Sequence, residues 1–174
     1  MERERLSPEA LRAMLDQHRR FLETEGREGA RADLGMYHVE EFDFGGADLS
    51  GVNLRGSVFT RCRFNGCDLY GAAFNRSSVA GADFTGAVLV KAEFHGADAR
   101  EARFDGARLV QAEFIGANLR AATFRRADLG GAVVSDCDLT DAVFDEANLE
   151  HAGLSDNTED GASWLGVRGR GQAA

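Results

Sequence analysis

A five-residue repeat runs through most of the chain. From Leu34 to Leu154 every fifth residue is apolar, which gives 25 consecutive repeat centres: ten Phe, eleven Leu, three Val and Ala99. The residue two places before the centre is Ala in 17 of these 25 repeats. A period of five fits neither the 3.6-residue turn of an α-helix nor the two-residue alternation of a strand. The repeat therefore indicates short extended pieces that alternate with turns.

The spacing of the apolar positions predicts how the chain winds. Side chains two residues apart share one face of an extended segment, so the centre and the small residue before it both point inward. The next inward residue comes three positions later, which requires a corner. The second residue after the centre is Gly in 11 of 25 repeats, and Gly turns most easily. A corner in every repeat predicts an all-β solenoid.

The identity of the centres adds a second period. From Phe64 to Leu129 every other centre is Phe and the centres between them are smaller. If each pentad forms one side of a coil, Phe stacks on Phe in successive coils only when each coil has an even number of sides. Coils with four sides leave room inside for Phe rings, whereas coils with two sides do not. We therefore predict about six coils of twenty residues, stacked at strand spacing. Two Phe ladders are expected, one of Phe64, Phe84, Phe104, Phe124 and Phe144 and one of Phe74, Phe94 and Phe114.

The chain divides into three segments. Residues 1–32 are predicted to hold a capping helix over 7–25 and its connection, because Ser7 can cap the helix and Pro8 suits its first position. The spacing of its residues gives this helix one largely apolar stripe, formed by Leu11, Met14, Leu15, His18, Phe21 and Leu22. Residues 33–155 are predicted as the β-helix. The pattern is lost in 156–174, where Trp164 and Leu165 are expected to form a C-terminal cap before a flexible tail.

The pentads resemble those of a known family. ADLSG at 47–51, ADFTG at 82–86 and ANLRA at 117–121 are similar to the A(D/N)LxG pattern of pentapeptide-repeat proteins. The resemblance covers about 120 of 174 residues. It implies a right-handed quadrilateral β-helix with four pentads per coil. It also implies a possible partner, since some family members resemble B-DNA in shape and charge, bind DNA gyrase or topoisomerase IV, and give quinolone resistance.

Composition narrows the classes of function and location. The net charge of −9 and the pI of about 4.9 argue against direct binding of nucleic acid or of an anionic membrane. The charged N-terminus and the lack of an 18-residue apolar run predict neither a secretory signal nor a membrane span. Three cysteines without CxxC spacing fit a reducing, cytoplasmic setting. Cys62, Cys67 and Cys137 replace the usual Ala, which favours small buried residues over a disulfide or metal site.

Catalytic motifs are lacking in the sequence. His18, His38, His95 and His151 are scattered without metal-ligand spacing. No phosphate-binding glycine loop, dinucleotide fingerprint or nucleophile elbow is present. A rod packed with Phe and Leu also offers no ordinary active-site pocket. The sequence therefore predicts no enzyme, no catalytic residue, no cofactor and no metal site.

Acidic residues gather near the end of the repeats. The stretch 136–150 contains no Lys or Arg and carries Asp136, Asp138, Asp141, Asp145, Glu146 and Glu150. One hypothesis is a DNA mimic that engages a type II topoisomerase; the other is that acids keep a rod soluble and protect its edges. The balanced charge of 81–135, the uninterrupted pentads and the absence of a long C-terminal helix differ from the topoisomerase-binding members.

Outward apolar residues suggest a second candidate surface. On a twenty-residue period, Tyr70, Val90 and Val110 form one stripe, Val88 lies beside Val90, and Ile115 lies on the neighbouring face. A contiguous apolar stripe is typical of a contact surface, although β-propensity also explains valines on a flat sheet.

The sequence thus predicts a non-enzymatic scaffold that presents a rigid acidic rod to a protein partner. One alternative is a DNA mimic that binds DNA gyrase and modulates it or protects it from quinolone-type inhibitors. The other is a self-associating structural element, which makes the expected state a monomer or a weak homodimer.

Overall fold

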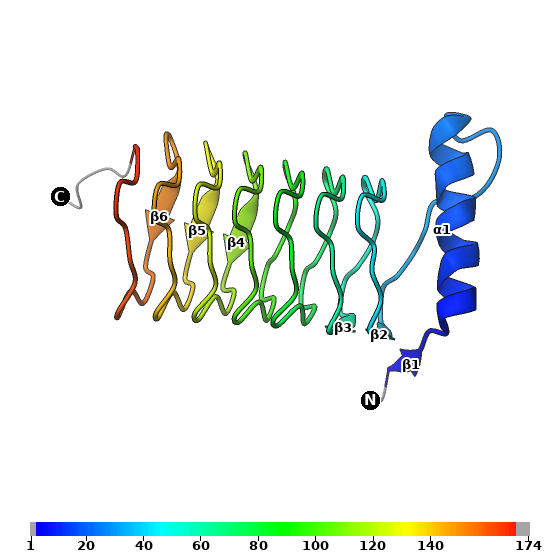
Figure 1. Ribbon diagram of the computed structural model, residues 1–174, viewed down its shortest axis with the longest axis horizontal. Helices are drawn as coiled ribbons and strands as arrows, with labels where there is room; N and C mark the ends of the chain where they lie inside the picture. The colour runs from blue at the N-terminus through cyan, green and yellow to red at the C-terminus, as the bar shows by residue number, and fades with distance from the viewer. Residues whose placement is uncertain (1–2, 170–174) are drawn as a thin grey trace.

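The extended segments of the chain form two small parallel sheets in a computed structural model, which describes residues 3–169. The strand orders are β1-β2-β3 and β4-β5-β6. In chain order the elements are β1 (Glu4–Arg5), α1 (Pro8–Glu23), β2 (Tyr37–Glu40), β3 (Val58–Thr60), β4 (Glu113–Ile115), β5 (Val133–Ser135) and β6 (Gly153–Ser155). Figure 1 shows the chain wound into a rod, with α1 lying across one end.

Backbone pairing recurs at intervals of twenty residues. Parallel bridges join Asp48 to Asp68, Asp68 to Val88, and Val88 to Arg108. Each repeat offers only a few extended residues before the next turn, so most pairings are isolated bridges rather than named strands. The structure therefore has the register that the alternation of centres predicts, in a solenoid of the β-helix type.

The corners place the second residue after the centre in the left-handed region. The φ angle is 65° at Gly86, and it is also 59° at Lys91 and 54° at Ala121. The amide of Ala87 donates to the carbonyl of Phe84 at 3.0 Å, which closes the turn around Gly86 in the manner of a type II turn. Sequence reasoning links the corners to Gly. In the structure the pairing on both sides imposes the same conformation on other residues, against a local cost of about 1–2 kcal/mol.

Substitutions at two corners test whether backbone pairing holds non-glycine residues in the left-handed conformation. Gly86→Ala is expected to lower the free energy of unfolding by about 1 kcal/mol, because strain in the left-handed region exceeds the entropy gained from a stiffer unfolded chain. No atom lies within 4 Å of the added Cβ, so no clash contributes. Ala121→Gly is expected to raise stability by up to about 1 kcal/mol for the converse reason. Urea denaturation followed by circular dichroism measures both, and destabilisation by both exchanges would contradict the account.

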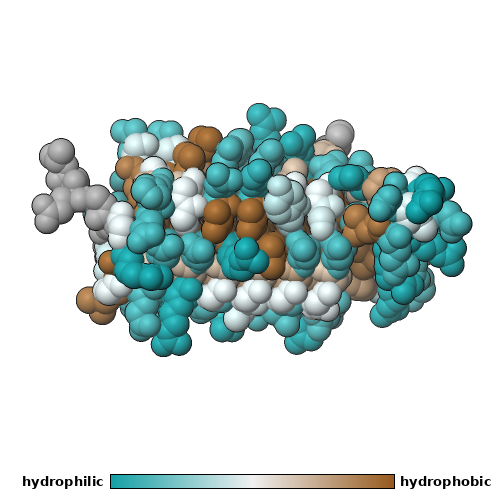
Figure 2. All heavy atoms as spheres, turned by 90° about the horizontal axis from the view of Figure 1, so that it is seen from above, coloured by the Kyte–Doolittle hydropathy of each residue, from teal (hydrophilic) through white to brown (hydrophobic). Residues whose placement is uncertain are grey.

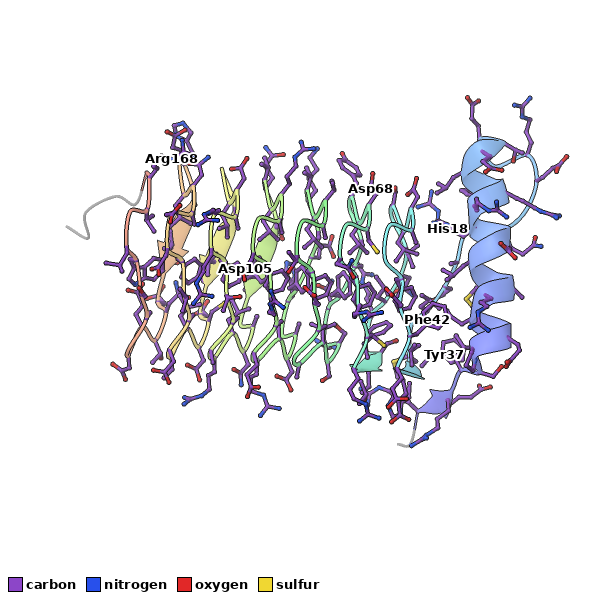
Figure 3. The ribbon with its side chains drawn as sticks, in the orientation of Figure 1. His18, Tyr37, Phe42, Asp68, Asp105 and Arg168 are labelled. Atoms are coloured by element: carbon purple, nitrogen blue, oxygen red, sulfur yellow. The ribbon has the colours of Figure 1, made fainter. Side chains whose placement is uncertain are left out.

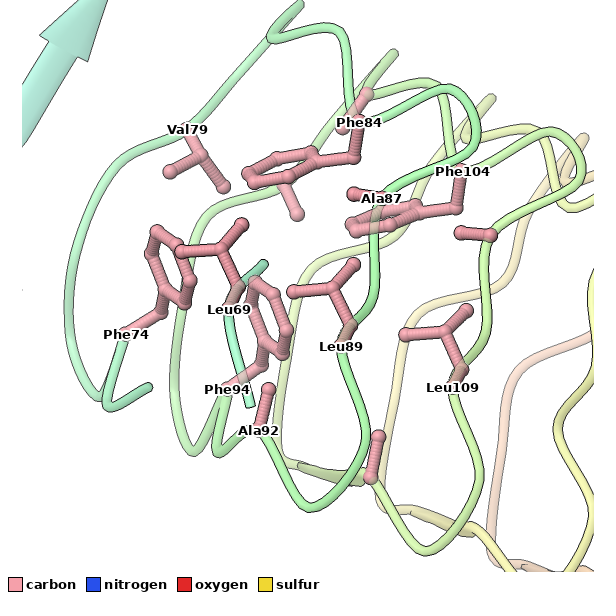
Figure 4. Close-up of a cluster of buried hydrophobic side chains, with 14 of the residues drawn as sticks. Leu69, Phe74, Val79, Phe84, Ala87, Leu89, Ala92, Phe94, Phe104 and Leu109 are labelled. Carbon is pink, nitrogen blue, oxygen red and sulfur yellow. The ribbon is translucent and has the colours of Figure 1, made fainter. Parts of the chain in front are cut away.

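Two columns of stacked phenylalanine rings fill the core (Figure 4). Phe84 and Phe104 stack at 4.9 Å and 4°, and Phe74 and Phe94 stack at 4.7 Å and 2°. The columns meet edge to face, as between Phe94 and Phe104 at 5.7 Å and 90°, which suits the charge distribution of the rings. Every centre from Leu34 to Leu149 is at most 2% exposed. The predicted ladders are therefore confirmed.

The Asp or Asn that precedes many centres stabilises the local turn of the backbone. The carboxylates of Asp68 and Asp83 accept hydrogen bonds from the amides of Tyr70 and Thr85, each at 3.0 Å. These amides belong to residues two positions later, so the motif is a local side-chain-to-backbone turn. Some of the acidic residues of the rod are therefore present because they stabilise the coil.

The N-terminal segment covers the first coil. α1 begins after Ser7, whose hydroxyl accepts from the amide of Ala10 at 3.2 Å, and it ends two residues before the predicted boundary. Leu11 and His18 are buried from the predicted stripe. The pairing of β1 with β2 was not predicted, because a two-residue charged strand has no apolar signature. The helix and β1 together occupy the open end of the solenoid.

Coil pairing continues past the residue where the sequence pattern ends. Asp138 pairs with Thr158, and Asn148 pairs with Arg168. Trp164 stacks on Phe144 at 4.3 Å and 6°, so it extends a phenylalanine column. The repeat pattern places a cap from residue 156, whereas the structure has a further coil there. Backbone pairing needs no particular side chain, which explains the difference. The flexible tail was expected over 166–174, but Arg168 is paired with Asn148 in this coil; residues 170–174 lie outside the described residues.

Candidate interaction surfaces

One face of the rod carries the predicted apolar stripe. We call it the upper face and define it by the residues that flank the centres Leu49, Leu69, Leu89, Leu109, Leu129 and Leu149. Tyr70 is 46% exposed, and Val88, Val90 and Val110 are half-buried between the side chains around them. Successive coils place Tyr70, Val90 and Val110 one above another, because the adjacent residues Asp68, Val88 and Arg108 are paired.

Charged side chains border this apolar group. The ammonium of Lys91 lies 5.9 Å from the centroid of the Tyr70 ring, within range of a cation–π interaction. Asp68 and Arg168, both on the upper face, lie along the upper edge of the rod in Figure 3. The view from above in Figure 2 therefore shows this face, where a small hydrophobic area in mid-rod is surrounded by hydrophilic side chains.

A second apolar group lies on the adjoining face, which carries β4, β5 and β6. Ile115 is 37% exposed and Val133 is 39% exposed. They occupy adjacent strands, with Glu113 paired to Val133 and Ile115 to Ser135. Val133 was missed because it precedes its centre and, unlike Val88, has no valine two residues later to mark it. Met36, at 56% exposure, was missed as well, and Leu165, which was expected to cover the last coil as part of the C-terminal cap, is 72% exposed instead.

The six acidic candidates are not gathered on one face. Asp136, Asp141 and Glu146 stand at three successive corners with φ of 55°, 58° and 59°. Asp138, Asp145 and Glu150 lie on three different faces, since they flank three successive centres. Fifteen residues span three quarters of a twenty-residue coil, so the acidic stretch runs three quarters of the way around the rod.

Arginines of the preceding coil neutralise part of this stretch. Arg120 lies 3.4 Å from Asp138 and Arg126 lies 3.0 Å from Glu146. The Thr140 hydroxyl, which donates to Asp138, lowers the pKa of that carboxyl, and Arg120 lowers it further. Hydrogen bonding from Ser163 likewise lowers the pKa of Asp145. These carboxylates are therefore held in their ionised form.

Charge is distributed unevenly along the rod. No Lys or Arg occurs between Arg126 and Arg168, whereas ten Asp and Glu residues lie in that interval. The preceding coils carry arginines among their acids, such as Arg63 beside Asp43 at 2.5 Å. The C-terminal end of the rod is therefore its most negative part.

A shallow hollow on the β4–β6 face was not predicted. It is lined by Asn53, Arg55, Asn75, Glu93 and His95 among others. Glu93 accepts from Asn75 at 2.7 Å and from Arg55 at 3.0 Å, and these contacts lower its pKa. The side chains come from three successive coils, so the network ties neighbouring coils together.

The cysteines show no reactive environment. Cys62, Cys67 and Cys137 are free and buried, and burial raises the pKa of each thiol to about 11. Within residues 3–169 no group of three His, Cys, Asp or Glu side chains is placed to hold a metal ion. The same part of the chain contains no helix long and apolar enough to cross a bilayer.

Comparison with known proteins identifies the repeat. The family model for pentapeptide repeats matches in eight copies, over residues 43–76, 67–106, 100–136 and 122–156. The chain belongs to the pentapeptide-repeat family. Pentapeptide-repeat proteins are generally structural or interaction proteins, which agrees with a repeat scaffold.

Several solved pentapeptide-repeat structures are similar to the chain. A protein of the Arabidopsis thaliana thylakoid lumen is 29% identical over 61% of this chain and 67% of its own, with a TM-score of 0.32. QnrB1, a plasmid-mediated fluoroquinolone resistance protein, is 24% identical over 76% of this chain and 84% of its own, with a TM-score of 0.32. Rfr23 of the cyanobacterium Cyanothece 51142 is 20% identical over 88% and 98%, with a TM-score of 0.39. No curated protein is significantly similar in sequence.

Proposed function

We propose that the protein is a non-enzymatic scaffold, a right-handed quadrilateral β-helix of about six coils that presents a rigid surface to a protein partner. The observation that carries this proposal is the outward apolar group of the upper face. Tyr70, Val88, Val90 and Val110 lie there, bordered by hydrophilic side chains.

The arrangement has the features of a protein-binding patch. Tyr and Val supply apolar area that can be desolvated, whereas the charged neighbours Lys91 and Arg108 supply a polar rim. Regular pairing between coils fixes the spacing of these side chains, so little conformational entropy is lost on binding. A partner with a complementary flat apolar strip would fit this surface.

Matched variants test the proposed surface. Val90→Glu on the upper face is expected to abolish recovery of the partner from the source lysate and to weaken the purified complex by at least about tenfold, because it places a charge at the centre of the patch. Val143→Glu makes the same exchange at a half-buried outward position of another face and should leave binding unchanged. Equal binding by wild type and Val90→Glu would contradict the proposal.

Self-association through the same face is an alternative outcome. Light scattering would then show a weak dimer that Val90→Glu and Val110→Glu dissociate. A strictly monomeric wild type at high concentration would exclude this alternative and leave a different protein as the partner.

A type II topoisomerase is the second candidate partner. It is favoured by the ten acidic residues between Arg126 and Arg168, which lie around the C-terminal end of the rod. Purified protein should then alter supercoiling by DNA gyrase, and reversal of Asp141 and Glu150 to Arg should remove the effect. Glu101→Arg, in a coil that carries arginines, is the control. No effect on gyrase at micromolar concentration would refute this candidate.

The proposed location is the cytoplasm. The support is chemical, since three free thiols are most easily maintained in a reducing compartment.

A further inference from the structure

His18 is enclosed between the capping helix and the first coil. Its side chain is 1% exposed, and it lies on the side of α1 that faces the solenoid, as Figure 3 shows. Leu11 is buried from the same helix, and Met14 and Leu15 pack against the core. The first coil has no earlier coil to cover it, so the contact that includes His18 is what closes this end.

The hydrogen bonds of His18 fit only the neutral ring. Nδ1 accepts a hydrogen bond from the amide of Ala32 at 3.3 Å, so it carries no proton. The proton of the neutral ring is then on Nε2, which is buried and has no hydrogen-bond partner among the described residues. A second proton would have to enter at Nδ1, where it would face the N–H of Ala32. Protonation and the present contact are therefore incompatible.

The charged groups around His18 do not compensate a positive ring. Burial lowers the pKa of His18 and is the largest effect. The carboxylate of Asp48, on the first coil, acts in the opposite direction, but it already accepts from the amide of Ser50 at 3.0 Å. Arg31, in the connection after α1, adds to the lowering. Within α1, Asp16 pairs with Arg19 at 3.1 Å.

We propose that protonation of His18 releases α1 from the first coil, so that acidification uncovers the N-terminal end of the solenoid. Pairing of β1 with β2 keeps the released helix attached to the rod. The surface uncovered belongs to the first coil, whose centres Leu34, Val39, Phe44 and Leu49 are buried when the helix is docked.

The direction of the pH dependence follows from the two states. In the docked state the pKa of His18 lies below its ordinary value of 6.5, and in the released helix it returns towards that value. Docking is therefore strongest above pH 6.5, weakens as the pH falls below it, and levels off below the docked pKa. Within that window the ratio of docked to released helix falls by up to about tenfold per pH unit.

Hydrogen–deuterium exchange of the full chain at about pH 7.5 and pH 5.0, corrected for intrinsic rates, tests the proposal. Protection of residues 8–23 should fall at the lower pH, by up to about thirtyfold for one proton with a released-state pKa of 6.5, while residues 81–126 keep theirs. His18→Gln retains an acceptor for Ala32 but does not titrate, so its helix should keep its protection. The control His151→Gln alters an exposed histidine and should behave as wild type. Unchanged protection in wild type, or equal loss in His18→Gln, would overturn the proposal.

A second measurement covers the case in which His18→Gln fails to dock at pH 7.5. An NMR titration of the wild-type imidazoles should give His18 a midpoint below 6.5, and helix amides should change with the same midpoint. Titration of His18 with a midpoint at or above 6.5, or with the helix still protected, would overturn the proposal.

Discussion

Phe104→Ala is expected to lower the free energy of unfolding by about 3–5 kcal/mol. The Phe104 ring stacks on Phe84 and on Phe124, each at 4.9 Å, and meets Phe94 and Phe114 edge to face at 5.7 and 5.8 Å. Backbone pairing above and below fixes the spacing of the coils, so the core cannot collapse into the space left by the ring. Urea denaturation followed by circular dichroism measures the loss.

Two variants of the same coil serve as controls. Phe104→Leu keeps most of the volume and should cost about 1–2 kcal/mol. Arg103→Ala changes the exposed neighbour, whose contacts with Asp83 and Asp105 are 4.0 and 3.9 Å, and should change stability by no more than about 0.5 kcal/mol. If Phe104→Ala costs no more than Arg103→Ala, the stacked rings do not govern stability.

The interior of the molecule could be predicted because it follows from spacing alone. Ala and Phe at the inward positions of each pentad fix which side chains meet, and the alternation of Phe with Leu fixes the twenty-residue register. The helix over Pro8–Glu23 was predictable for a similar reason, because Ser7 and the apolar stripe are local signals.

Features that depend on backbone pairing could not be predicted from side chains. β1 is a two-residue segment, Glu4–Arg5, that gains its structure only by pairing with β2. The coil that contains Trp164 keeps Ala162 two places before it, but it has Glu159 and Gly169 where apolar centres are expected, and it forms because the preceding coil offers free backbone groups. The left-handed conformation of Ala121 likewise reflects its place between two paired segments.

The candidate surfaces could be predicted only in part. The upper-face stripe was found because Tyr70, Val90 and Val110 recur at twenty residues. The acidic stretch looks like one patch in the sequence, yet its carboxylates are spread over three quarters of a turn around the rod, since neighbours in sequence occupy different faces. Asp138 shows a further limit, because its carboxylate accepts from the Thr140 amide at 3.0 Å and so also maintains the coil. A residue that the coil itself requires cannot be taken as evidence for a binding partner. Binding specificity is therefore expected only from outward residues that the coil does not require.

The N-terminal end of the solenoid is covered by α1, and this closure is open to a direct test. Leu11→Asp is expected to undock α1, because it removes a leucine that is 1% exposed and places a carboxylate in an apolar contact. The loss of docking free energy should be at least about 2–5 kcal/mol, the cost of deleting a buried leucine. Hydrogen–deuterium exchange of residues 8–23 measures the undocking, and binding of an apolar dye measures exposure of the first coil.

Ala13→Asp is the matched control for this test, since it adds the same charge to the same helix at an exposed position. It should leave exchange and dye binding as in wild type. Stability of the central coils should be nearly unchanged in both variants, because each coil of a solenoid contacts only its neighbours. Equal protection of α1 in Leu11→Asp and Ala13→Asp would mean that pairing of β1 with β2, rather than the apolar stripe, holds the helix on the rod.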